Sequence, residues 1–216
     1  MLTSRRLYQI CGLLFIFIAV LTQQVISEGW LNDFDIDAIG TSRDIKANHL
    51  FFSITVALGL RGLILAICLP LLGWVSWKRK SWIPIAGFIL ILIFETGLAG
   101  SLKMAVGRSF PYEAQRGHLM HNPGEMAFPS GHTTNAMALW GYTAWYLSLG
   151  WSHVKRRRLA MLVAFVGAEV AVSSWLLRTH WPTDTVCGLA LGGIALAAVV
   201  ALYTALGFNQ PAISRR

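Results

Sequence analysis

Charged residues are scarce in this sequence of 216 residues. They make up 13% of it, whereas hydrophobic residues make up 55% and the mean hydropathy is +0.56. A typical soluble domain carries about 25% charged residues, and here the apolar residues also stand in long blocks. The composition therefore excludes an ordinary soluble protein and indicates a single domain, residues 1–216, that is embedded in a membrane.

Acidic residues are absent where basic residues cluster. Eleven of the eighteen Lys and Arg residues stand in four short tracts beside apolar blocks, at residues 5–6, 78–80, 155–158 and 215–216. This asymmetry follows the positive-inside rule, so the formal net charge of +8 reports membrane topology. Because the tracts share no folded face, the charge does not indicate nucleic-acid binding.

Cysteine is also scarce. The three cysteines, Cys11, Cys68 and Cys187, lie in apolar segments. Their odd number and their spacing match neither a disulfide framework nor a zinc site. We therefore expect small core residues at these positions.

The apolar blocks predict an all-α bundle of six transmembrane helices, at about residues 7–26, 60–77, 82–106, 131–149, 159–177 and 183–206. We interpret the first block as an uncleaved helix, because it is as long as a span and lacks a convincing small-residue cleavage site. The polar, acidic residues 27–47 are expected to form an external loop, and residues 48–59 a short interfacial helix. With the basic tracts inside, both termini are predicted to be cytoplasmic.

Three segments that this topology places on the outer face concentrate polar and ionisable residues. They are residues 103–111, with Lys103 and Arg108; residues 128–132, with Ser130, Gly131 and His132; and residues 173–184, with Arg178, His180 and Asp184. The distribution of basic residues, considered without any motif, places all three segments on the same face of the membrane. Their convergence there is independent support for a site.

The Pro129-Ser130-Gly131 sequence is typical of a helix start, with proline near the first turn and a serine that can cap. Free backbone N–H groups and the helix dipole favour an anion there, and Gly131 lets the backbone approach it closely. His132 lies in the same first turn. The segment therefore predicts an anion site with a histidine beside it.

Asp184 follows His180 by four residues and stands in the first turn of the next predicted helix. Its carboxylate can accept a hydrogen bond from one ring nitrogen of His180, which fixes the tautomer and leaves the other nitrogen as a nucleophile. Positive charge for phosphate oxygens is available from three residues of these segments, Lys103, Arg108 and Arg178.

Over residues 103–184 the chain resembles the type 2 phosphatidic acid phosphatase superfamily, whose signatures are Lys-x6-Arg-Pro, Pro-Ser-Gly-His and Ser-Arg-x5-His-x3-Asp. The resemblance implies that His180 attacks phosphorus and forms a phosphohistidine, that Asp184 orients it, and that His132 acts as general acid and then as general base. It also implies a site without a metal or cofactor, in which the phosphate is held by Lys103, Ser130 and the Gly131 amide.

Two positions depart from this pattern, because Phe110 and Ser174 stand where the family has arginine. Arg108 lies two residues before Phe110, and Arg178 lies one helical turn after Ser174. Our hypothesis is that Arg108 and Arg178 replace the two family arginines. The alternative is that both are interfacial residues and the site is weakened.

The function that the sequence favours is hydrolysis of a lipid phosphate or diphosphate at the outer face of a bacterial-type inner membrane. Candidate substrates are undecaprenyl diphosphate, phosphatidic acid, phosphatidylglycerol phosphate and lipid A. Two alternatives stay open: a lipid phosphotransferase that uses the same phosphohistidine, and a non-catalytic lipid-binding protein of the same family. The expected partners are the bilayer and a lipid phosphate, and the sequence does not tell which proteins it binds.

Overall fold

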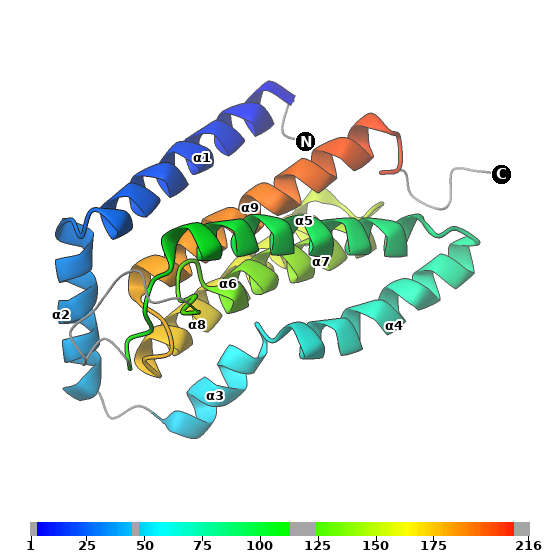
Figure 1. Ribbon diagram of the computed structural model, residues 1–216. Coiled ribbons are helices and arrows are strands. Elements are labelled where there is room, and N and C mark those ends of the chain that lie inside the picture. Colours follow the sequence, from blue (N-terminus) through cyan, green and yellow to red (C-terminus); the bar gives the residue numbers. More distant parts are fainter. Residues whose placement is uncertain (1–3, 45–47, 113–123, 210–216) are drawn as a thin grey trace.

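The computed structural model describes residues 4–44, 48–112 and 124–209, and each regular element in these ranges is a helix (Figure 1). The elements are α1 (Ser4–Ile26), α2 (Trp30–Asp44), α3 (His49–Ala57), α4 (Arg61–Arg79), α5 (Ile83–Val106), α6 (Gly131–Asn135), the π-helical η2 (Ala136–Trp140), α7 (Gly141–Leu147), α8 (His153–Leu176) and α9 (Pro182–Ala205). The predicted all-α class is confirmed for the described residues.

Within the part of the chain that the structure describes, five helices are long and apolar enough to cross a membrane, namely α4, α5, α8, α9 and, in α1, the stretch Gln9–Ile26. They account for five of the predicted spans, and the chain is an integral membrane protein. The predicted span at 131–149 is helical in three consecutive parts, α6, η2 and α7. The short helix predicted at 48–59 is present as α3.

Residues 27–47 differ from the external loop predicted for them, because α2 occupies most of this segment. Its buried residues recur at helical spacing along one face: Asn32, Asp35, Ile39 and Ser42. Three of these four side chains are polar, so a search for apolar periodicity does not find this helix. A second difference is that α8 begins at His153, which places the basic tract 155–158 inside the helix rather than before it.

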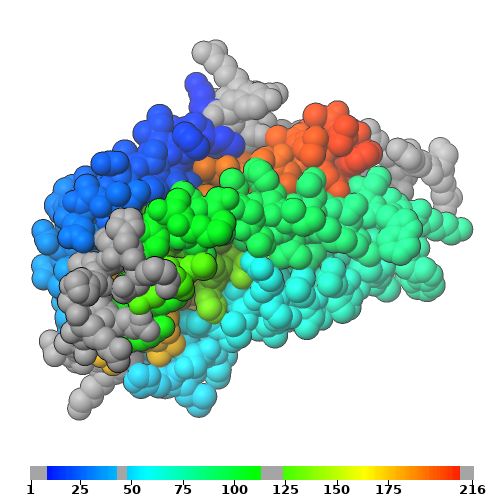
Figure 2. All heavy atoms as spheres, viewed as in Figure 1, coloured from blue at the N-terminus to red at the C-terminus, as the bar shows by residue number. Residues whose placement is uncertain are grey.

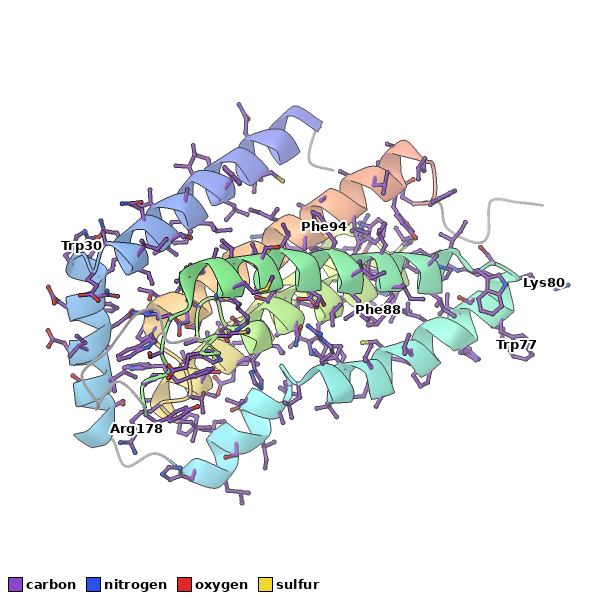
Figure 3. The ribbon with its side chains drawn as sticks, viewed as in Figure 1. Trp30, Trp77, Lys80, Phe88, Phe94 and Arg178 are labelled. Carbon is purple, nitrogen blue, oxygen red and sulfur yellow. The ribbon has the colours of Figure 1, made fainter. Side chains whose placement is uncertain are left out.

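The bundle has two ends of different character (Figure 1). α2, α3 and the start of α9 lie at one end, whereas α1 begins, α9 finishes and α4 turns into α5 at the other. In Figure 3, Trp30 and Arg178 mark the first end, and Trp77 and Lys80 mark the opposite one. The basic tract at residues 78–80 is thus remote from the end that carries the starts of α6 and α9. The tract at 215–216 lies outside the described residues.

The main apolar core packs around Tyr142, between α4, α5, α7 and α9. The hydroxyl of Tyr142 donates to the backbone oxygen of Pro84 at 3.0 Å, and the hydroxyl of Tyr203 donates to the backbone oxygen of Ile83 at 3.1 Å. Both acceptors lie in the first turn of α5, so these bonds attach the core to the α4–α5 end of the bundle. Buried polar residues gather at the opposite end instead.

Glycine at position 188 of α9 allows that helix to touch the start of α6. A Cβ atom at Gly188 would lie 2.2 Å from Oγ1 of Thr133 and 2.5 Å from the backbone oxygen of Ser130. Only a residue without a side chain fits at that separation. The contact fixes the segment that contains His180 and Asp184 against the segment that contains Ser130 and His132.

Candidate active site

The three polar segments predicted to converge do lie together, at the end of the bundle where α5 finishes and α6 and α9 begin. The backbone N–H of Ser130 donates to the backbone oxygen of Asp184 at 2.9 Å, which joins the second segment to the third. Nζ of Lys103, in the last turn of α5, donates to the backbone oxygen of Met126, just before the second segment. The fold thus brings residues far apart in the chain to one place.

His180 is held at the start of α9 by Asp184. Its Nδ1 atom lies 3.4 Å from Oδ2 of Asp184, and that oxygen also accepts the backbone N–H of Trp181 at 3.1 Å. Pro182 occupies the first helical turn, where a proline costs no hydrogen bond. His180 is 6% exposed and Asp184 is fully buried. This pairing favours the tautomer with its proton on Nδ1, so Nε2 is left with a free lone pair.

Arg108 is buried behind Asp184 and binds protein groups through both terminal nitrogens. Nη1 donates to Oδ1 of Asp184 at 2.7 Å and to Oγ1 of Thr183 at 2.8 Å. Nη2 donates to Oδ1 of Asn32 and Oδ2 of Asp35, each at 2.7 Å. The side chain is only 1% exposed and both terminal nitrogens are occupied by protein groups, an arrangement that differs from the direct phosphate contact expected from the sequence. It instead connects the carboxylate of the His180 pair to α2.

The residues of α2 that complete this network were not predicted from the sequence. Asp35 accepts the backbone N–H of Thr183 at 3.0 Å and also its hydroxyl. Burial raises the pKa of Asp35, although the nearby Arg108 guanidinium acts in the opposite direction. Asn32 and Asp35 belong to a set of mostly polar residues that recur at helical spacing along α2. A search for polar residues at this spacing could have identified them from the sequence.

His132 lies opposite His180. The centroids of the two imidazole rings are 6.3 Å apart. The two rings therefore border one space between the starts of α6 and α9. The ring of Phe110 lies 5.5 Å from that of His180, so an aromatic side chain borders this space at one position where the family signature has arginine.

Ser130 supplies a further polar group at the same place. Its hydroxyl oxygen is buried and has no hydrogen-bond partner among the described residues. The backbone oxygen of Ser130 accepts the hydroxyl of Thr134 at 2.8 Å, which fixes the start of α6. Buried hydroxyls are normally hydrogen-bonded, so this one is suited to a ligand. Gly131, beside it, is half-buried.

Arg178 is not brought to this cluster. Its side chain is exposed, its backbone is left-handed with φ of 57°, and no described hydrogen bond involves its guanidinium. Figure 3 shows it at the edge of the molecule, and this differs from the expectation that it replaces a family arginine. The hydroxyl of Ser174, at the other departing position, donates to the backbone oxygen of Val170 at 2.7 Å.

Among the described residues, no three His, Cys, Asp or Glu side chains are grouped as metal ligands. The polar groups gathered at these helix ends are the two imidazoles, the buried Ser130 hydroxyl and the Lys103 ammonium in the last turn of α5. Such a set provides a nucleophile, a proton donor and hydrogen-bond donors for an anion.

The fold is that of a known class of membrane enzymes. It is similar to the crystal structure of a transmembrane PAP2 type phosphatidylglycerolphosphate phosphatase from Bacillus subtilis, with a TM-score of 0.79, 20% sequence identity and coverage of 91% of this chain and 96% of that one. The sequence profile of the PAP2 superfamily matches residues 84–208, and the chain belongs to this superfamily.

A curated relative is phosphatidylglycerophosphatase B of Bacillus subtilis (strain 168). It is 27% identical over 139 residues, which make up 62% of this chain and 65% of the relative. The match thus covers just under two thirds of the relative's length.

Proposed function

We propose that this protein hydrolyses a phosphate or diphosphate on a membrane lipid through a phosphohistidine at His180, without a metal. The observation that carries the proposal is the position of His180, whose Nδ1 lies 3.4 Å from Asp184 and whose ring lies opposite that of His132. Membership of the PAP2 superfamily agrees with it.

In the first step Nε2 of His180 attacks phosphorus, the new P–N bond forms and the bond from phosphorus to the leaving oxygen breaks. His132, protonated, gives its proton to that oxygen. In the second step neutral His132 takes a proton from water, the water oxygen attacks phosphorus and the P–N bond breaks. Inorganic phosphate leaves, and both histidines return to their starting states.

The charge that develops on the phosphoryl oxygens needs fixed donors. We assign this role to Lys103, the unpartnered hydroxyl of Ser130 and the Gly131 amide. Arg108 has a different task, because its terminal nitrogens are already bound within the protein. We infer that it is a positioning residue, which holds the Asp184 carboxylate so that His180 keeps its orientation and tautomer.

We further propose that the chain is one phosphatase domain with six spans, in which α6, η2 and α7 together form the fourth. Both termini would be cytoplasmic and the site would face the outside of an inner membrane. The basic residues 78–80, at the end remote from the site, support this orientation. The name of the curated relative makes phosphatidylglycerophosphate the first substrate to test, ahead of phosphatidic acid, undecaprenyl diphosphate and lipid A.

The test is release of inorganic phosphate from these lipids by the purified protein in detergent, with chelator present. His180→Ala is expected to abolish turnover, and the matched variant His153→Ala, which changes an exposed histidine at the start of α8, is expected to retain it. Turnover that requires added metal, or that survives His180→Ala, contradicts the mechanism. Transfer of label to a second lipid with little free phosphate would identify a phosphotransferase instead.

A further inference from the structure

Arg61, the first residue of α4, is held by two residues of other helices. Its Nη2 atom donates to Oε1 of Glu95 at 3.2 Å and to Oδ1 of Asn135 at 3.3 Å. Glu95 is fully buried, and its Oε1 also accepts the hydroxyl of Thr96 at 3.0 Å. A buried carboxylate in a membrane helix requires a partner, and Arg61 provides it.

The guanidinium of Arg61 lies next to the candidate active site. Asn135 also donates to the backbone oxygen of Gly59 at 3.1 Å, and a Cβ atom at Gly59 would lie 2.6 Å from the backbone oxygen of His132. The start of α4 therefore packs directly on the first turn of α6. Asn135 follows His132 by three residues, which is about 4.5 Å along the helix axis. Arg61 thus lies nearer the middle of the bundle than His132.

Arg61 is also open to a ligand. Its side chain is 42% exposed, and both hydrogen bonds described for its guanidinium come from Nη2, so Nη1 and Nε keep donors for another group. Figure 2 shows the yellow-green segment that contains the start of α6 reaching the surface between α5 and the cyan helices α3 and α4. This part of the surface lies between the helix that carries Glu95 and the one that begins with Arg61.

When a lipid reacts at His180, its hydrocarbon chains must lie in the bilayer while its head group is in the site. The reacting phosphoryl lies between His132 and His180 near the end of the bundle, so the part of the head group that follows it passes the next turn toward the membrane. At that depth the described residues place Arg61, a cation whose guanidinium is already oriented by Glu95. Charge-assisted hydrogen bonds from such a guanidinium suit a phosphate oxygen.

We propose that Arg61 forms a second anion subsite, which binds the phosphate that lies between the reacting phosphoryl and the lipid chains. The site then prefers lipids with two anionic groups, a diphosphate or a phosphomonoester joined to a phosphodiester, over lipids with a single phosphomonoester. This inference rests on the proposed function, since it assumes that the phosphoryl attacked by His180 belongs to a lipid. It assigns the preference to a residue outside the three signature segments.

The experiment compares kcat/KM for phosphatidylglycerophosphate, which has two anionic groups, with that for phosphatidic acid, which has one. Arg61→Gln is expected to lower kcat/KM for phosphatidylglycerophosphate about tenfold or more, mainly by raising KM. A change of this size corresponds to the loss of one charge-assisted hydrogen bond. The value for phosphatidic acid is expected to change by less than about twofold. Arg61→Lys should retain part of the preference, and Arg178→Gln, an exposed arginine, should retain all of it.

Equal losses on both lipids, or no loss on either, overturn the subsite. Because Arg61→Gln leaves Glu95 buried without its cation, the double variant Arg61→Gln/Glu95→Gln is measured as well and is expected to show the same selective loss. Binding of the two lipids to His180→Ala, with and without Arg61→Gln, gives a readout that needs no turnover. If the wild type releases phosphate from neither lipid, the proposed function fails, and a selective loss of binding would still support the subsite.

Discussion

Nη1 of Arg108 lies 2.7 Å from Oδ1 of Asp184, and the other oxygen of that carboxylate lies 3.4 Å from Nδ1 of His180. The arginine therefore reaches the histidine only through the aspartate. Asn32 and Asp35 bind its other nitrogen at 2.7 Å, so α2 supports the same carboxylate from behind. A chain of buried polar contacts thus runs from α2 to the candidate nucleophile.

Arg108→Gln is expected to lower kcat about a hundredfold, because a displacement of about 1 Å at a reacting group has an effect of this size. KM should change little if Arg108 acts, as we propose, by positioning Asp184 and not by binding the lipid. Removing one partner of a buried ion pair also costs about 3–5 kcal/mol of stability, so thermal unfolding in detergent is measured beside activity.

The milder variant Asn32→Ala removes one of the four acceptors and keeps the ion pairs. It is expected to lower kcat less than Arg108→Gln, again at nearly constant KM. A rise in KM without a fall in kcat, in either variant, would show that Arg108 binds the substrate itself.

Arg178→Gln is expected to retain activity within about twofold, because exposed side chains outside special contacts usually contribute less than about 0.5 kcal/mol. Comparison with Arg108→Gln distinguishes the roles of the two arginines, to which the sequence hypothesis gave the same role. The measurement is kcat/KM on the same lipid and at the same ionic strength. A tenfold loss would instead mean that Arg178 contacts the lipid in the complex.

The sequence predicted the five long membrane helices well, because the length and apolarity of a span are properties of one continuous segment. It did not predict where α8 begins. Lys and Arg at a helix end can extend their charged groups into water while the backbone stays helical, so the tract at 155–158 does not mark the helix boundary. It did not predict α2 either, because that helix buries polar side chains whose partners lie elsewhere in the chain.

In the candidate site, too, the residues set by local sequence were predicted and those set by long-range contacts were not. Short-range patterns located His132, His180 and Asp184, because each stands within a few residues of a helix start. The partners of Arg108 are separated from it by 73 to 76 positions in the sequence. Such long-range contacts have no local pattern, so sequence spacing alone placed Arg108 on the phosphate rather than behind Asp184.

Gly188→Ala is expected to lower kcat about a hundredfold. Its Cβ atom would meet Oγ1 of Thr133 at 2.2 Å and the backbone oxygen of Ser130 at 2.5 Å, so the start of α6 must move away from α9. The overpacking should also cost about 1–3 kcal/mol of stability.

The matched control is Gly193→Ala on the same helix, where the nearest atom, Cδ1 of Leu14, lies at an ordinary contact distance of 3.7 Å. It is expected to keep full activity. Because alanine is a better helix former than glycine by about 1 kcal/mol, its melting temperature should be equal or slightly higher. Equal activity of both variants would show that the α6–α9 contact does not position the site.

Phe110→Arg tests whether the departure from the family signature weakens phosphate binding. The Phe110 ring lies 5.5 Å from that of His180 and stacks on Tyr112 at 5.5 Å. An arginine here would place a guanidinium beside the space between the two histidines, and one charge-assisted hydrogen bond is worth about 1.5–3 kcal/mol. We expect KM for the lipid phosphate to fall roughly tenfold, with some loss of stability from the lost aromatic stacking.

Phe110→Leu, which stays apolar, should leave KM unchanged. A folded Phe110→Arg protein with the KM of the wild type would mean that position 110 does not contact the phosphate, and the oxygens would then be bound by Lys103, Ser130 and the Gly131 amide alone.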